Sequence, residues 1–163
     1  IRPSVVCGVE DNFTNLFAKL SMSPVIPVVK IKYKFQPILV NDVATAIVKS
    51  IEFKKNEGKI YEIGGPKVIS FGDIVKSILS TIGKKRLVID LPMPLAKIQA
   101  TLFSLMPKPL LTKDQCQILN EADNIVSNNY LTLKDLNIKP NDVEQTMSKW
   151  LWRFRTGGEF AKI

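Results

Sequence analysis

The sequence contains no histidine, and its 163 residues include only two cysteines, Cys7 and Cys116. The two cysteines lie far apart and form no Cys-x-x-Cys pair, so zinc sites built from cysteine and histidine are excluded within this chain. Catalytic serine–histidine and cysteine–histidine pairs are excluded for the same reason. Two lone cysteines in a lysine-rich chain indicate a reducing compartment.

Long hydrophobic runs are also missing. The nearest candidate for a membrane span is LPMPLAKIQATLFSLMPKPLL, which Lys97, Gln99 and three internal prolines interrupt. No secretory or transit segment is visible. The sequence therefore predicts a globular chain rather than a membrane-spanning one.

Negative charge is scarce relative to positive charge, and the formal net charge is +8. Such an excess can indicate an anionic partner, namely nucleic acid, a membrane surface or an acidic protein. The basic residues are mostly lysines spread along a chain rich in Ile, Lys and Asn, which favours coding bias as the explanation. With 45% apolar and 23% charged residues, the length suits one ordinary domain.

The first half of the chain alternates extended and helical patterns. Residues 2–7 resemble a strand that ends at a glycine turn, and apolar residues at helical spacing follow the acidic pair Glu10–Asp11. Pro37 predicts an edge strand or a loop. Residues 41–51 predict a helix capped by Asn41 or Asp42, with one apolar stripe listed as Val43, Ala44, Ile47, Val48 and Ile51. Residues 59–65 predict a short strand.

The second half is mainly helical in pattern. A helix follows the predicted cap Ser70 and ends at Gly83, and residues 86–92 predict a strand. Further helices are predicted over 94–106, after a capping box from Thr112 to Gln115, and as a single turn in TLKDLNI. A last helix is expected to begin with a capping box formed by Asn141 and Glu144. Its inner face is predicted to consist of Val143, Met147, Trp150, Leu151 and Phe154. The mixture implies an α/β or α+β domain.

Three segments in a fixed order carry a family resemblance. They are RPSVVCGVEDNF, FQPILVNDVATAIVKSI and GKIYEIGGPKVISFGDIVKSIL. Together they resemble the C-terminal half of extended short-chain dehydrogenase/reductases over roughly residues 1–83. The later segments PKPLLTKDQ, DNIVSNN and WLWRFR are similar to an atypical branch of that superfamily, the NAD(P)-binding accessory subunit of respiratory complex I and its bacterial relatives.

The superfamily's nucleotide-binding and catalytic signatures are absent. No GxGxxG or GxxGxxG follows a strand, and neither Gly64–Gly65 nor Gly157–Gly158 supplies one. Tyr130 and Lys134 match Tyr-x-x-x-Lys formally, but they lie on the wrong side of the Arg-Pro strand, so the match is interpreted as coincidence. Both signatures normally precede that strand, and the chain is therefore expected to be the downstream half of a longer or split protein.

The resemblance implies a fold and a cofactor site. The expected fold is α/β: the C-terminal part of an extended Rossmann-type domain, with late strands and helices over residues 1–65 and a mainly helical substrate or docking lobe over 66–163. The expected cofactor is NADP(H) or NAD(H), bound mostly by the upstream half. The residues expected to contact the nicotinamide are Arg2, Pro3, Ser4, Val5 and Val6. The first strand is expected to have an unpaired edge unless other sequence supplies its neighbour.

Other polar, glycine and aromatic residues have both a functional and a structural interpretation. Asp42 is interpreted as a helix cap, and Gly64–Pro66 as a turn rather than a phosphate loop. The terminal aromatic and basic residues could bind nucleic acid or a membrane interface. They are interpreted as an amphipathic helix with outward arginines at a protein interface.

The resemblance also implies a function. No catalytic residue is assigned within this chain, and the expected function is an accessory or assembly subunit of complex I whose nucleotide is structural. The alternative is half of an active NAD(P)-dependent reductase or nucleotide-sugar epimerase; a basic module binding nucleic acid or membrane is a third option. The expected partners are the missing N-terminal half or other respiratory-complex subunits, near a membrane. The expected location is the bacterial cytoplasm, at the inner membrane, or the mitochondrial matrix.

Overall fold

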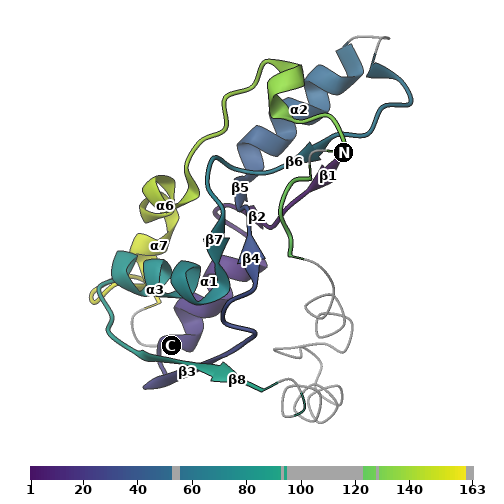
Figure 1. Cartoon of the computed structure of the whole chain (residues 1–163). Coiled ribbons are helices and arrows are strands. Elements are labelled where there is room, and N and C mark those ends of the chain that lie inside the picture. Colours follow the sequence, from purple (N-terminus) through teal and green to yellow (C-terminus); the bar gives the residue numbers. More distant parts are fainter. Residues whose placement is uncertain (53–55, 93, 95–122, 128, 161–163) are drawn as a thin grey trace, which may run out of the picture.

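A computed structural model of the chain describes residues 1–52, 56–92, 94, 123–127 and 129–160 (Figure 1). Apart from Pro94, the predicted helix over 94–106 lies outside these residues, as do the predicted capping box from Thr112 to Gln115 and Cys116. The predicted division of the chain near residue 65 stays a prediction.

Short strands alternate with helices along the described chain. The strands are β1 (Arg2–Pro3), β2 (Val6–Cys7), β3 (Val25–Val29), β4 (Lys34–Phe35), β5 (Ile38–Leu39), β6 (Glu62–Ile63), β7 (Ile69–Ser70) and β8 (Leu87–Leu91). The helices are α1 (Asn12–Leu20), α2 (Val40–Glu52), α3 (Phe71–Thr81), α6 (Val143–Thr146) and α7 (Ser148–Leu151), with 3-10 helices η2 (Leu133–Leu136) and η3 (Trp152–Phe154). The expected α/β class is confirmed.

Parallel pairing dominates the strands. β1 pairs with β6, β2 with β5 and β3 with β8, all in parallel, whereas β4 and β7 are antiparallel. The predicted strand over residues 2–7 is interrupted by a bend at Ser4–Val5, so its two pieces pair with different partners. Within the described residues, β1 and β2 each form a ladder on one side only.

The larger hydrophobic cluster joins α1, α3, β3 and the C-terminal helices. At its centre are four phenylalanine rings, Phe13, Phe17, Phe35 and Phe71, whose contacting centroids are 5.2–5.6 Å apart. A smaller cluster lies between α2, β5, β6 and η2. The helical spacing of Phe13 and Phe17 in the sequence is thus explained by core packing.

Local capping signals were predicted well where they act within one turn. The Asp11 carboxylate accepts the Thr14 amide at the start of α1, and the Ser70 hydroxyl accepts the Asp73 amide at the start of α3. Gly83 ends α3 with a φ of +71°, a conformation that favours glycine. The predicted cap Ser70, the predicted end at Gly83 and the helix start at the acidic pair Glu10–Asp11 are confirmed, and the structure adds that Asp11 is the cap of α1.

The predicted cap of α2 is wrong. The helix already begins at Val40, so Asn41 and Asp42 lie inside its first turn. Asp42 is 5% exposed, and its carboxylate accepts hydrogen bonds from the backbone amide of Asn141 at 2.8 Å and from the Asn141 side-chain amide at 2.7 Å. Asp42 therefore connects α2 to a segment 99 residues away in the sequence. Of the predicted apolar stripe, Val43 packs against the smaller hydrophobic cluster, whereas Ala44, Ile47, Val48 and Ile51 are exposed.

The predicted last helix is divided into three short pieces, α6, α7 and η3. Its cap is Asp142, whose carboxylate accepts the Glu144 amide, because Asn141 is engaged by Asp42. The predicted inner face is confirmed, since every one of its residues is buried; they are Val143, Met147, Trp150, Leu151 and Phe154.

The two C-terminal arginines anchor the chain end rather than pointing freely outward, which corrects the prediction. The Arg153 guanidinium donates to the Val9 carbonyl and, at 3.1 Å, to the Asn15 side-chain oxygen. Arg155 Nε donates to the Thr81 carbonyl at 2.8 Å. These groups close the ends of α1 and α3 and are therefore engaged structurally. The predicted protein interface in this region stays a prediction.

Candidate functional site

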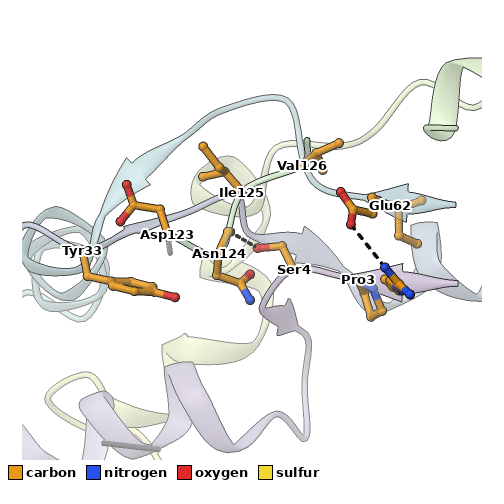
Figure 2. A pocket seen from close by; sticks show the side chains of 10 residues that line it. Pro3, Ser4, Tyr33, Glu62, Asp123, Asn124, Ile125 and Val126 are labelled. Carbon is orange, nitrogen blue, oxygen red and sulfur yellow. Dashed lines mark hydrogen bonds and ion pairs between the residues drawn. The ribbon is translucent and has the colours of Figure 1, made fainter. Parts of the chain in front are cut away.

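A polar cavity of about 230 Å³ lies beside β1 and β6 (Figure 2). Its wall combines four segments that are distant in the sequence: β1 and the following residue, Tyr33, β6, and residues 123–126. The lining residues are Arg2, Pro3, Ser4, Tyr33, Glu62, Ile63, Asp123, Asn124, Ile125 and Val126. The volume is smaller than that of most drug-sized ligand pockets, so the cavity suits a ring-sized fragment.

Ser4 joins two sides of this wall. Its hydroxyl donates to the Asn124 carbonyl at 2.8 Å and accepts the Gln36 amide at 3.1 Å. The hydroxyl therefore fixes residues 123–126 against the bend between β1 and β2. Figure 2 shows the Ser4 side chain directed at the backbone of Asn124.

Gln36 supports the same wall from behind. Its side-chain nitrogen donates to the Gly65 carbonyl at 2.8 Å, and its side-chain oxygen accepts the Val126 amide at 3.0 Å. The backbones are so close here that a Cβ on Gly65 would be 1.9 Å from the Pro37 carbonyl oxygen. Gly64 and Gly65 are buried by this close approach, which favours the interpretation of these glycines as a structural turn rather than a phosphate loop.

Glu62 is one of two acidic residues in the described cavity wall, the other being Asp123. Its carboxylate accepts the Ser127 hydroxyl at 2.6 Å and the Ser127 amide at 3.0 Å, and these two hydrogen bonds hold the pKa of Glu62 below its ordinary value. Arg2 lies 3.9 Å from the same carboxylate and over the Tyr130 ring, 5.0 Å from its centroid. Since Glu62 is held ionised, it acts as an electrostatic and positioning group rather than as a proton donor near neutral pH.

Asn124 carries an acceptor that the described protein groups leave unused. Its side-chain oxygen is buried and has no hydrogen-bond partner among the described residues. A buried oxygen of this kind is costly unless a donor reaches it. Because this oxygen is buried, it is not open to a group that occupies the cavity.

The described lining of the cavity offers few groups that could bind a pyrophosphate. Arg2 is its one cationic lining residue, and no glycine-rich turn feeding a helix N-terminus lines the described wall. Pyrophosphate binding by these residues alone is therefore not supported.

The structure brings together three of the five predicted contact residues. Arg2, Pro3 and Ser4 line the cavity. Val5 packs against the larger hydrophobic cluster and Val6 against the smaller one, so both valines serve the core. Nicotinamide contact by any of the five stays a prediction.

Sequence reasoning missed the most distinctive cavity residues. Tyr33, Glu62 and Asn124 come from three segments, and Glu62 and Asn124 belong to YEIGG and DNIVSNN. Both segments carried the family resemblance, which was the one available signal. The approach of residues 123–126 to β1 depends on tertiary structure and has no local pattern.

Other candidate groups have structural roles. Tyr130 precedes η2 and lies outside any helix, so Tyr130 and Lys134 do not share the helical face on which a Tyr-x-x-x-Lys pair depends. Cys7 is fully buried, and burial raises the pKa of its thiol far above the usual range. The described residues contain no group of acidic or cysteine side chains suited to a metal ion. None of the helices placed in the structure is long and apolar enough to cross a bilayer.

Comparisons with known proteins place this geometry in context. No protein-family model matches the chain. It is 29% identical over 167 residues to NADH dehydrogenase [ubiquinone] 1 alpha subcomplex subunit 9, mitochondrial, of Dictyostelium discoideum, covering 100% of this chain and 47% of the relative. The Arabidopsis thaliana protein of the same name is 31% identical over 172 residues, covering 97% of this chain and 42% of the relative. The chain thus spans less than half the length of these relatives.

A solved structure supports the fold assignment. The chain matches dTDP-4-dehydrorhamnose reductase from Bacillus anthracis, solved in complex with NADP, with a TM-score of 0.56 and 20% identity. The match covers 94% of this chain and 45% of that one. The C-terminal part of an extended Rossmann-type domain is therefore the fold.

Proposed function

The chain is a homologue of the complex I alpha subcomplex subunit 9 proteins of the extended short-chain dehydrogenase/reductase family, and from this premise we propose that it forms the C-terminal part of an NAD(P)(H)-binding accessory subunit. The observation that carries the proposal is the match to these subunits over the whole chain. The cavity beside β1 supports it, because the expected Arg-Pro strand forms one wall.

In this proposal the chain holds only the nicotinamide end of NADP(H) or NAD(H). Asn124 lies on the wall beside the ring, and Ser4 keeps residues 123–126 in place. The charged residues of the wall are Arg2, Glu62 and Asp123. A bound nicotinamide supplies hydride chemistry. The proposal that the nucleotide is structural is supported by the match to subunits of a respiratory complex.

The proposed partners are the remaining part of the same accessory subunit and other subunits of a respiratory complex. The relatives named above are mitochondrial by name, and this supports a location in the mitochondrial matrix or at the corresponding cytoplasmic face of a bacterial inner membrane. In either location the chain would function beside the membrane.

The test is to coexpress the chain with the polypeptide encoded upstream of Ile1, purify the pair, release its small molecules and identify them by mass spectrometry. We expect about one NADP(H) or NAD(H) per pair and no turnover with carbonyl or sugar-nucleotide substrates. Asn124→Leu should lower the affinity for that nucleotide about tenfold, or ~1.4 kcal/mol. The matched control is Asn129→Leu, because Asn129 is exposed and lies outside the cavity lining.

Two results would contradict the proposal. A pair that contains no nicotinamide nucleotide would remove the cofactor assignment. Steady hydride transfer would instead support the alternative, half of an active reductase or epimerase, a class to which the solved dTDP-4-dehydrorhamnose reductase belongs by name.

A further inference from the structure

Gln36 lies between β4 and β5 and is not among the lining residues of the cavity, yet its backbone contacts three segments around it. Its amide donates to the Asn124 carbonyl and to the Ser4 hydroxyl, both at 3.1 Å, and its carbonyl accepts the Gly65 amide at 3.2 Å. These contacts place Gln36 where the bend after β1, the end of β6 and residues 123–126 meet. Because they use only the backbone, they do not explain why a glutamine occupies this position.

The side chain of Gln36 adds two hydrogen bonds of opposite sense. Its nitrogen donates to the Gly65 carbonyl at 2.8 Å, and its oxygen accepts the Val126 amide at 3.0 Å. The two partners require one donor and one acceptor on the same side chain, which an amide supplies and an ionised carboxylate does not. The Gln36 amide therefore sets the separation between the end of β6 and residues 123–126.

Gly64 makes room for this bridge. A Cβ at Gly64 would lie 2.8 Å from Gln36 Cδ and 2.8 Å from Val126 Cγ2, so both side chains pack close to the Gly64 backbone. Val126 lines the cavity, whereas Gln36 reaches the wall only through its neighbours. The side chain of Gln36 therefore acts on the cavity through the position of Val126.

We propose that Gln36 is a positioning residue of the cavity, which holds residues 123–126 at the distance from β1 that nucleotide binding requires. This inference rests on the proposed function. Figure 2 shows Asn124 and Val126 on the segment that passes beside Ser4. A binding site loosens by about 1 Å when the residues behind its wall are not fixed. Loss of the bridge should therefore weaken nucleotide binding in a protein that is still folded.

The test measures, by isothermal titration, the affinity of the coexpressed pair for NAD+ and for NADP+ after dialysis to remove copurified nucleotide. Gln36→Met keeps an unbranched side chain but removes its N–H donor and its oxygen acceptor. This variant should bind the nucleotide about tenfold more weakly than the unmodified pair at a temperature well below both Tm values. The matched control is Trp150→Phe, in the larger hydrophobic cluster and outside the cavity lining. The control should lower Tm and leave the affinity within twofold.

Hydrogen exchange of the Val126 amide supplies a second measurement, made on the 163-residue chain without a nucleotide. In Gln36→Met this amide loses its side-chain acceptor and should exchange at least tenfold faster, whereas the amides of α3 should keep their rates. Gln36→Glu keeps an acceptor for Val126 but has no donor for Gly65 when it is ionised, so its loss of affinity should be smaller. Gln36→Glu also decides the question in place of Gln36→Met if the methionine variant does not fold.

The outcomes separate this inference from the function on which it rests. If the unmodified pair binds a nucleotide and the folded Gln36 variants bind it within twofold, Gln36 has only a structural role, and the inference is overturned while the proposed function stands. An equal loss of affinity in Trp150→Phe would assign the effect to stability and would overturn the inference as well. If the unmodified pair binds neither nucleotide, the proposed function fails, and this inference fails with it.

Discussion

Replacing Asp42 with asparagine distinguishes a helix cap from a long-range connection. Asparagine caps helices about as well as aspartate, so a capping role predicts a change within a few tenths of a kcal/mol. In the structure the carboxylate instead accepts two hydrogen bonds from Asn141, at 2.8 and 2.7 Å. An asparagine side chain has one oxygen, and its NH2 group would face the second donor. The connection therefore predicts a clear loss of stability.

The magnitude follows from the two hydrogen bonds and the exposure of their donor. Hydrogen bonds to an ionised acceptor contribute about 1.5–3 kcal/mol each. Because Asn141 is exposed, water can solvate the released amide, and one bond can survive in Asp42→Asn. The expected loss is therefore about 2 kcal/mol in total, which corresponds to ~4–8 °C in Tm for a chain of this length.

The assay is thermal unfolding followed by circular dichroism, confirmed by urea titration. Asn141→Ala removes the side-chain donor, and the double variant completes a cycle that should give a coupling free energy above about 0.5 kcal/mol between the two positions. A Tm for Asp42→Asn within ~1 °C of the unmodified chain would refute the connection and restore the capping interpretation.

Three further predictions concern the support of the cavity and the core. Gly65→Ala should leave little folded protein in a solubility and circular dichroism assay, because its Cβ would lie 1.9 Å from a backbone carbonyl oxygen. The pKa of Glu62 is lower in the folded chain than in the unfolded chain, so ionised Glu62 stabilises the fold at pH values above the ordinary pKa of a carboxyl group, and this stabilisation is lost as the pH falls through about 4. Ser127→Ala removes the hydroxyl that lowers this pKa, so the urea midpoint of unfolding should depend less on pH between about 3 and 6. Trp150→Phe, which loses a buried indole hydrogen bond to α1, should cost about 1–3 kcal/mol in urea unfolding, whereas Trp152→Phe, at a side chain 55% exposed, should cost under ~0.5 kcal/mol.

Hydrogen bonds between residues close in the sequence could be predicted from it, whereas those between distant residues could not. The caps at Asp11 and Ser70 act on amides three residues away. The sequence identified Ser70 as a cap and placed the start of α1 at the acidic pair that includes Asp11. Asp42 and Asn141 are 99 residues apart, and each resembles a local cap when only its neighbours are considered. Both capping predictions failed for one shared reason, because these two side chains bind each other.

The candidate site shows the same limit. Arg2, Pro3 and Ser4 were identified through a family resemblance, and the structure places them on the cavity wall. Asn124 could not be chosen from its surroundings in the sequence, because its place in the cavity wall comes from the approach of residues 123–126 to Ser4 in the folded chain. Residues contributed by separate segments become recognisable as a site only when the tertiary structure is known.

Helix α2 shows what a hydrophobic period can and cannot establish. The spacing of Ile47, Val48 and Ile51 correctly grouped these residues on one face, because that grouping depends only on helix geometry. The usual further step, that the apolar face is the one packed on the core of the same chain, assumes that the chain contains its own cover. Here Asp42 and Lys49 hold the polar side of the helix to the chain through specific hydrogen bonds. The helix is therefore held by these polar contacts together with Ala46 and Val43, which pack in the smaller hydrophobic cluster, while Ile47, Val48 and Ile51 stay exposed.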